Sequence, residues 1–178
     1  MNERLKSIVD LEKYPIYDLN SPIIKNLINR CKEELDQSSC STISNFILPK
    51  SLEIMNLELE KQLNEVYMSK ESINPYLYAK DDPNLPKDHP KRTFMNRYNG
   101  YLNSDCFPKN SEMKYLYETD ELLKFISACL GVSPIYRWAD PLACHAYNVM
   151  NPKGILPWHF DSCEFTLSIM IQKPEKGG

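Results

Sequence analysis

An alternating segment, residues 165–172, constrains the fold of this chain more than any other feature. Its sequence is FTLSIMIQ, so that large apolar residues occupy every second position. A period of two is typical of a β-strand that packs one face against a core. Upstream, residues 151–154 (NPKG) predict a turn, and Pro157 predicts an extended chain after it. We therefore expect a strand to begin near residue 159 and a shorter strand over residues 143–150.

His159 and Asp161 lie two residues apart at the predicted start of the strand. An imidazole and a carboxylate at this spacing can bind one metal ion together, and they form two thirds of the facial triad that holds non-haem Fe(II). His-x-Asp is also a short motif that arises by chance. A structural pair, hydrogen-bonded to each other or to nearby backbone groups, is the alternative.

The order of several short runs resembles the Fe(II)/2-oxoglutarate-dependent oxygenases that hydroxylate or halogenate free amino acids. The resemblance covers nearly the whole chain. The runs that carry it are 74–76 (NPY), 81–92 (DDPNLPKDHPKR), 136–143 (YRWADPLA), 148–150 (NVM), 156–161 (LPWHFD), 165–167 (FTL) and 172–178 (QKPEKGG).

The resemblance implies an α+β fold in which helices precede a double-stranded β-helix, a jelly-roll barrel like that of cupins. His159 and Asp161 would be catalytic residues and the first two Fe(II) ligands. The family's distal His ligand and the Arg that binds 2-oxoglutarate fall beyond residue 178, so we expect a barrel truncated at the C-terminus and a third ligand absent from this chain. Halogenating members have Gly where this chain has Asp161, which favours hydroxylation.

The activity implied by the resemblance is hydroxylation of an unactivated C–H bond, with O2 and 2-oxoglutarate consumed and succinate and CO2 released. The substrate would be a free amino acid or a similar small polar molecule. By the same resemblance, Asn148 and Tyr147 would contact 2-oxoglutarate. Trp158 would form a wall of the substrate site, and Asp140 would bind the substrate ammonium, unless Asp140 is simply the turn residue that an Asp-Pro pair often provides.

Residues 72–106 read as a long, proline-rich loop without apolar periodicity. Arg92 and Arg97 lie in it, and Arg suits a substrate carboxylate because its planar fork binds both oxygens. Arg97, between Phe94 and Tyr98, is the stronger candidate. The alternative is that the basic residues of this loop are solvated surface charges.

Three amphipathic helices are expected in the N-terminal part. Ser21 and Pro22 begin the first, residues 51–68 carry the second, and the third is capped by Thr119 and ended by Gly131. We expect a single domain over residues 1–178, with a helical part over 1–135 and the first barrel strands over 136–178.

Composition places limits on the function. The chain has 178 residues, 42% of them hydrophobic, a net charge of -3 and a pI near 5.7. This charge offers no basic surface for nucleic acid, and no apolar run suggests a membrane span or a signal peptide. Six cysteines lack Cys-x-x-Cys spacing, so reduced thiols and a cytoplasmic location are expected. The oligomeric state is not indicated.

Two histidines outside the motif are not expected to be metal ligands: His145 is expected to be structural or to support a ligand, and His89 to be an ordinary loop residue. His145 lies in the strand before the motif, and His89 lies in the proline-rich loop. Two other functions also stay open: a non-catalytic or partner-dependent fragment of such an enzyme, and a cupin-like metal-binding protein without oxygenase activity. An isolated half-barrel would expose unpaired strand edges and apolar surface, which argues against a stable isolated fragment.

Overall fold

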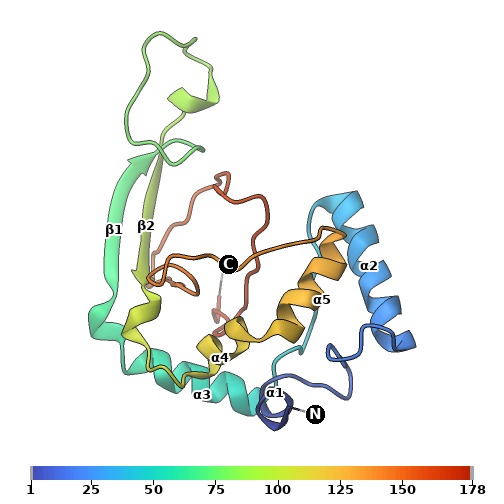
Figure 1. The fold of residues 1–178 in the computed structure, drawn as a ribbon. Helices are drawn as coiled ribbons and strands as arrows, with labels where there is room; N and C mark the ends of the chain where they lie inside the picture. The colour runs from blue at the N-terminus through green and yellow to red at the C-terminus, as the bar shows by residue number, and fades with distance from the viewer. Residues whose placement is uncertain (1, 177–178) are drawn as a thin grey trace.

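The computed structural model describes residues 2–176 and shows a mixed α/β fold (Figure 1). Within this range, five α-helices accompany one three-stranded antiparallel sheet. The helices are α1 (Glu3–Ile8), α2 (Pro22–Ser38), α3 (Pro49–Glu60), α4 (Glu112–Glu118) and α5 (Asp120–Leu130). The strands are β1 (Tyr67–Ile73), β2 (Met95–Leu102) and β3 (Tyr147–Val149).

The sheet has the order β1-β2-β3, with both neighbouring pairs antiparallel. β1 and β2 pair over seven residues, from Tyr67 opposite Tyr101 to Ile73 opposite Met95. In Figure 1 this long hairpin stands at one side of the molecule, α3 lies at its base, and α2 and α5 lie on the opposite side. The residues between β1 and β2 form a large excursion beyond the far end of the hairpin. Tyr147, Asn148 and Val149 add the short third strand along β2.

Local signals explain where the helices begin and end. The Ser21 hydroxyl accepts the N–H of Ile24, and Pro22 occupies the first turn of α2, as predicted. α5 begins after Thr119 and ends at Gly131, whose φ of 69° is the left-handed conformation that favours glycine. The predicted start of α2 and end of α5 are confirmed, and Thr119 occupies the N-cap position of α5, but its side chain donates to the Tyr115 carbonyl and makes no capping hydrogen bond.

The second predicted helix is confirmed only over its first part. α3 begins at Pro49 and ends at Glu60, and a short 3-10 turn over Leu63–Glu65 follows it. The predicted range of 51–68 was therefore too long, because Tyr67 and Met68 belong to β1. Backbone pairing with β2 supplies hydrogen bonds that continuation of the helix would have supplied locally. Two short helices, α1 and α4, were not predicted.

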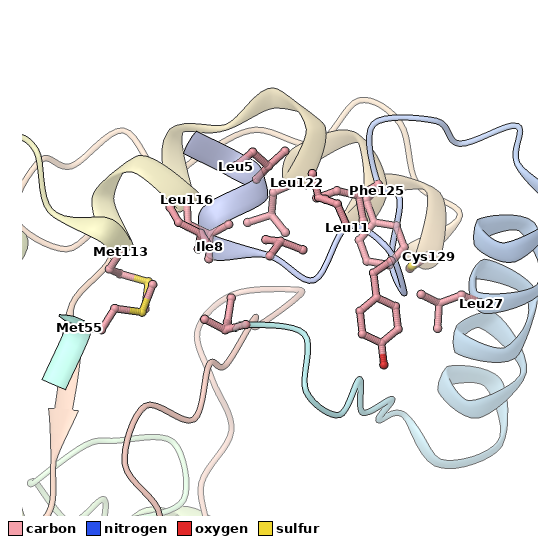
Figure 2. Packing of buried hydrophobic residues seen from close by; sticks show 14 of the residues in the cluster. Leu5, Ile8, Leu11, Leu27, Met55, Met113, Leu116, Leu122, Phe125 and Cys129 are labelled. Carbon is pink, nitrogen blue, oxygen red and sulfur yellow. The ribbon is translucent and has the colours of Figure 1, made fainter. Parts of the chain in front are cut away.

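The core lies among the helices and the base of the sheet (Figure 2). Phe125, Ile8, Met55, Leu116 and Leu102 are completely buried. In Figure 2, Met55 of α3 meets Met113 of α4, while Phe125 of α5 lies beside Leu11. Burial of this apolar surface is the main stabilising contribution to the fold.

The predicted loop over residues 72–106 contains a strand, and that part of the prediction is wrong. Residues 95–102 form β2, the central strand, although its sequence MNRYNGYL is mostly polar. Each of its edges is paired, one with β1 and the other with β3. The loop is therefore limited to residues 74–94, where Pro90–Arg92 forms a short 3-10 turn.

The predicted strand over residues 165–172 does not form: the structure assigns no strand there. Phe165 and Leu167 are 46% and 54% exposed, whereas Ile169 and Ile171 pack against the core. A strand needs a neighbour for its backbone groups, and no described strand pairs with this segment. The strand expected over 143–150 is confirmed in shortened form as β3. Residues 177–178, the end of the last resemblance run, lie outside the described range.

The coarse α+β prediction is confirmed by the helices and antiparallel strands of the described range. The double-stranded β-helix stays a prediction. No helix in residues 2–176 combines the length and apolar character needed to cross a membrane.

Candidate metal and ligand site

His159 and Asp161 approach each other in a loop, not in the strand predicted there. His159 Nε2 lies 3.3 Å from Asp161 Oδ1, and the two side chains are 22% and 50% exposed. The other nitrogen, Nδ1, lies 2.7 Å from the carbonyl oxygen of Pro157. The hydroxyl of Thr166 donates to Asp161 Oδ2 at 2.7 Å. Each side chain is therefore held by one contact outside the pair.

The contact with Pro157 determines which nitrogen of His159 carries a proton. A carbonyl oxygen only accepts hydrogen bonds, so Nδ1 must donate. In the neutral ring, Nε2 then has a lone pair, and this atom lies 3.3 Å from a carboxylate oxygen of Asp161. Two acceptors at this distance repel each other, and a metal ion bound by both would remove that repulsion.

The donor atoms fit a metal ion in three respects. Two ligands about 2.1 Å from one metal and at right angles to each other are about 3 Å apart, close to the 3.3 Å between Nε2 and Oδ1. Metal-bound His characteristically donates its second nitrogen to a backbone carbonyl, as His159 does to Pro157. Ligating carboxylates are themselves hydrogen-bonded, as Asp161 is by Thr166. Among residues 2–176 no group of three His, Cys, Asp or Glu side chains comes together, so the third ligand stays a prediction.

Contacts with the β1–β2 hairpin fix the position of this loop. Tyr98 of β2 and Ile155 exchange two backbone hydrogen bonds of 2.7 Å. Phe160 donates its N–H to the carbonyl of Pro75 at 2.8 Å, and its ring lies 5.2 Å from that of Tyr76. The residue between the two candidate ligands is therefore attached to the chain just beyond the end of β1.

Trp158 does not form an enclosed wall. Its indole is 66% exposed and meets Phe160 edge to face, with ring centroids 4.7 Å apart. Phe160 in turn contacts Tyr76. These three rings form one aromatic row beside the candidate ligands, and the row is open to solvent on the Trp158 side.

A second cluster of polar side chains lies on one face of the sheet. It links Arg97 and Asn148, which the sequence predicted separately as candidate site residues. Arg97 Nε donates to Asn99 Oδ1 at 2.8 Å. Asn99 Nδ2 donates to Asn148 Oδ1 at 2.7 Å. The guanidinium also lies over the ring of Tyr101, 4.8 Å from its centroid. Arg97 and Asn148 are therefore connected through a single, fully buried asparagine.

Tyr147 and Asn148 face opposite sides of the sheet, as adjacent strand residues must. Asn148 is exposed on the polar face. Tyr147 is 8% exposed and stacks on Phe107 at 4.5 Å within the core. Burial raises the pKa of Tyr147, and its hydroxyl has no hydrogen-bond partner among the described residues. One ligand cannot contact both side chains from this strand.

Arg92 and Asp140 are engaged in local structure. Arg92 binds both oxygens of Asp81, at 2.9 and 2.8 Å, and donates to the carbonyl of Leu85. The hydrogen bond from Arg92 lowers the pKa of Asp81. Asp140 accepts the N–H of Leu142 at 2.8 Å, which is the Asp turn described as its alternative role. The structure brings neither residue into contact with His159 or Asp161.

The remaining histidines make local contacts. His89 Nδ1 accepts the N–H of Lys91 and caps the 3-10 turn. His145 Nδ1 lies 3.1 Å from the Cys144 sulfur, and Nε2 is buried without a partner in the described part of the chain. Burial, assisted by the charge of Lys114, lowers the pKa of His145.

Comparison with known proteins adds no family assignment to this geometry. No family model matches the sequence, and no curated protein matches it. The contacts described above are therefore the basis for assigning a function.

Sequence reasoning missed Ser69, Glu71 and Asn99, the other polar residues of the same sheet face. Ser69 and Asn99 are opposite each other, as are Glu71 and Arg97. Their shared face becomes visible only when β1 and β2 are paired in register. The available signal was the alternation of Arg97, Asn99 and Tyr101, which places all three on one side of a strand.

Proposed function

We propose that this chain belongs to an Fe(II)/2-oxoglutarate-dependent dioxygenase that hydroxylates an unactivated C–H bond of a free amino acid or a similar small polar substrate. His159 and Asp161 supply two of the metal ligands in this proposal. The third ligand is not assigned to a residue of this chain. The three antiparallel strands are proposed as part of a double-stranded β-helix.

The observation that carries the proposal is the distance of 3.3 Å between His159 Nε2 and Asp161 Oδ1. Because Pro157 accepts from Nδ1, Nε2 of the neutral ring keeps a lone pair, and this atom lies close to the carboxylate. A divalent cation bound by both groups would use imidazole and carboxylate, which is the donor set of non-haem iron sites.

When bound, iron and 2-oxoglutarate supply the oxidising chemistry with O2, which no protein side chain provides. The chain's residues hold and orient the reacting groups. Pro157 keeps His159 in the tautomer that binds metal, and Thr166 holds one oxygen of Asp161 while the other faces Nε2. A carboxylate at this position, rather than glycine, occupies the site that a halide would need and so favours hydroxylation.

Substrate binding is assigned to the polar face of the sheet. Arg97 is half-buried and its Nε bonds to Asn99, which leaves the two terminal amino groups of the guanidinium available to a carboxylate. The loop with His159 is tied to Tyr98, the neighbour of Arg97 in β2. The same strand therefore supports both the candidate metal loop and the candidate substrate residue.

An anaerobic titration of the purified chain with Fe(II), with and without 2-oxoglutarate, tests the metal assignment. We expect His159→Ala and Asp161→Ala each to weaken Fe(II) binding by more than about tenfold, the range that even supporting residues produce. His89→Asn is the matched control, because asparagine can still accept the Lys91 N–H. Unchanged binding in both ligand variants would remove the metal site.

A second readout separates an oxygenase from a metal-binding protein. In a form of the protein that also supplies the proposed third ligand and the Arg that binds 2-oxoglutarate, with O2 and a free amino acid present, the proposal expects 2-oxoglutarate to be converted to succinate. In that form 2-oxoglutarate should tighten Fe(II) binding, and by linkage Fe(II) should tighten 2-oxoglutarate binding equally. Fe(II) binding that is indifferent to 2-oxoglutarate in that form would contradict the oxygenase and support the cupin-like alternative.

A further inference from the structure

Glu71 and Arg97 are direct cross-strand partners of opposite charge, but they do not pair with each other. They face each other in the β1–β2 register, where directly opposed Cβ atoms are about 5 Å apart. In the part of the chain that the structure describes, neither side chain forms a salt bridge. Something other than their mutual attraction therefore sets the positions of the two charged groups.

Each charged side chain bonds instead to a polar residue two positions along its own strand. The Ser69 hydroxyl donates to Glu71 Oε1 at 2.8 Å, and Arg97 Nε donates to Asn99 Oδ1 at 2.8 Å. Ser69 and Asn99 are themselves cross-strand partners. Because the strands are antiparallel, both charged side chains lean in the same direction, toward that pair.

Ser69 and Asn99 are buried, with 4% and 0% of their surface exposed. Their own positions are therefore constrained, and Asn99 is held further by its bond to Asn148. Glu71 is exposed and Arg97 is half-buried. Two fixed polar residues thus hold a carboxylate and a guanidinium side by side, with part of each open to solvent.

We propose that Ser69, Glu71, Arg97 and Asn99 form the site for the charged head group of an α-amino acid. Glu71 binds the ammonium group and Arg97 binds the carboxylate. An α-amino acid carries these two charges on one carbon, so a cation and an anion held side by side complement it. This inference rests on the proposed function for its substrate class and names the residue, Glu71, that distinguishes amino acids from other carboxylates.

Ser69 and Asn99 act as positioning residues in this site. Ser69 holds one oxygen of Glu71 and leaves the other free. Asn99 uses its oxygen for Arg97 and its amide for Asn148. Charged partners that are already oriented lose less conformational entropy when a ligand binds.

The test measures binding of the free L-amino acids, one by one, to the purified 178-residue chain by saturation-transfer difference NMR with EDTA present. The tightest binder is then compared with its N-acetyl derivative, which lacks the ammonium, and its methyl ester, which lacks the carboxylate. Both derivatives are expected to bind about 10- to 100-fold more weakly, the range for loss of one charged hydrogen-bonded contact.

Glu71→Gln should weaken binding of the amino acid by a similar factor and should make the amino acid and its N-acetyl derivative equivalent. Arg97→Lys should reduce the difference in affinity between the amino acid and its methyl ester, because lysine lacks the planar fork that binds a carboxylate. It should have a smaller effect on the difference in affinity between the amino acid and its N-acetyl derivative. Glu53→Gln, an exposed change on α3, is the matched control and should leave all affinities unchanged.

The proposal would be overturned if no amino acid bound. It would also be overturned if the wild type and Glu71→Gln distinguished the amino acid from its N-acetyl derivative by the same factor. Because EDTA removes metal, this result is separate from the proposed reaction. Amino-acid binding without Fe(II) binding in the other test would preserve the head-group site and reject the oxygenase. Fe(II)-dependent succinate formation, together with unchanged amino-acid affinity in Glu71→Gln, would preserve the oxygenase and reject the head-group site.

Discussion

The hydroxyl of Thr166 donates to Asp161 Oδ2 at 2.7 Å, on the carboxylate that faces His159 through its other oxygen. Thr166 thereby limits rotation of the carboxylate without occupying the oxygen nearest to Nε2. Supporting residues of this kind typically contribute about 10- to 100-fold to metal affinity. We expect Thr166→Val to weaken Fe(II) binding by about tenfold in an anaerobic titration, whereas Thr166→Ser should retain wild-type affinity. Equal affinities in both variants would show that the hydroxyl does not support a ligand.

Asp161→Gly removes the carboxylate from the candidate metal site. Under the proposed function, in a protein that also supplies the third ligand, hydroxylation of the amino-acid substrate should be lost, and the vacated position should become available to chloride. Product analysis by mass spectrometry, with and without chloride, measures both outcomes. Hydroxylation at the wild-type rate would remove Asp161 from the ligand set.

Gly100 is predicted to be intolerant of any larger residue. A Cβ added there would lie 2.5 Å from Val66 Cγ1, 2.9 Å from Met68 Sδ and 3.2 Å from the carbonyl oxygen of Val149. We expect Gly100→Ala to lower the free energy of unfolding by about 1–3 kcal/mol through overpacking, measured by urea denaturation. Ser72→Ala, an exposed change on β1, should stay within about 0.5 kcal/mol of the wild type.

Phe125 of α5 is completely buried, and it stacks on Phe46 with ring centroids 6.1 Å apart. Phe125→Ala should cost about 3–5 kcal/mol of stability, since it removes apolar burial and leaves a cavity. Tyr136, which is 83% exposed, supplies the control, and Tyr136→Ala should change stability by less than about 0.5 kcal/mol. Similar losses in both variants would place Phe125 outside the core.

His145 should make stability depend on pH. Its pKa is lowered in the folded state from the ordinary value of 6.5, first by burial and then by Lys114. The unfolded chain therefore binds a proton more readily, and the stability present above 6.5 is lost as pH falls through that value. Urea denaturation between about pH 7.5 and pH 5.5 measures this slope. His145→Asn should reduce it, and an unchanged slope would assign the dependence to other groups.

The bidentate contact between Arg92 and Asp81 should order the loop over 74–94 without contributing to global stability. Both groups are at the surface, where ion pairs contribute little. Arg92→Lys keeps the charge but loses the fork and the simultaneous bond to Leu85. We expect faster cleavage by chymotrypsin in this loop and an unchanged urea midpoint. A shifted midpoint would show that the loop is part of the cooperative core.

Helix ends with a strong local signal could be predicted from the sequence. Ser21 and Pro22 determine the start of α2, and Gly131 determines the end of α5, because each acts on backbone groups within one turn. The pairing of His159 with Asp161 could also be anticipated, since the two residues are close in the chain. The sequence did not predict that this pair lies in a loop.

The strand assignments could not be predicted, because strand formation depends on a distant partner. Residues 95–102 lack apolar periodicity but form β2 between two neighbours. Residues 165–172 have ideal alternation but no strand partner in the described range. Alternation reports which face of a strand would be buried, not whether a neighbouring backbone is available.

The sequence by itself determined the chemistry that the chain can offer: an imidazole and a carboxylate two residues apart, capped amphipathic helices, and arginines near aromatic residues. These features depend on covalent spacing and on hydrogen bonds within a turn. The tertiary structure alone decided which of those groups meet. Pairing of β1 with β2 placed Glu71 opposite Arg97, and pairing of β2 with β3 placed Asn148 against Asn99. The physical reason is that long-range contacts depend on the register between strands distant in the chain.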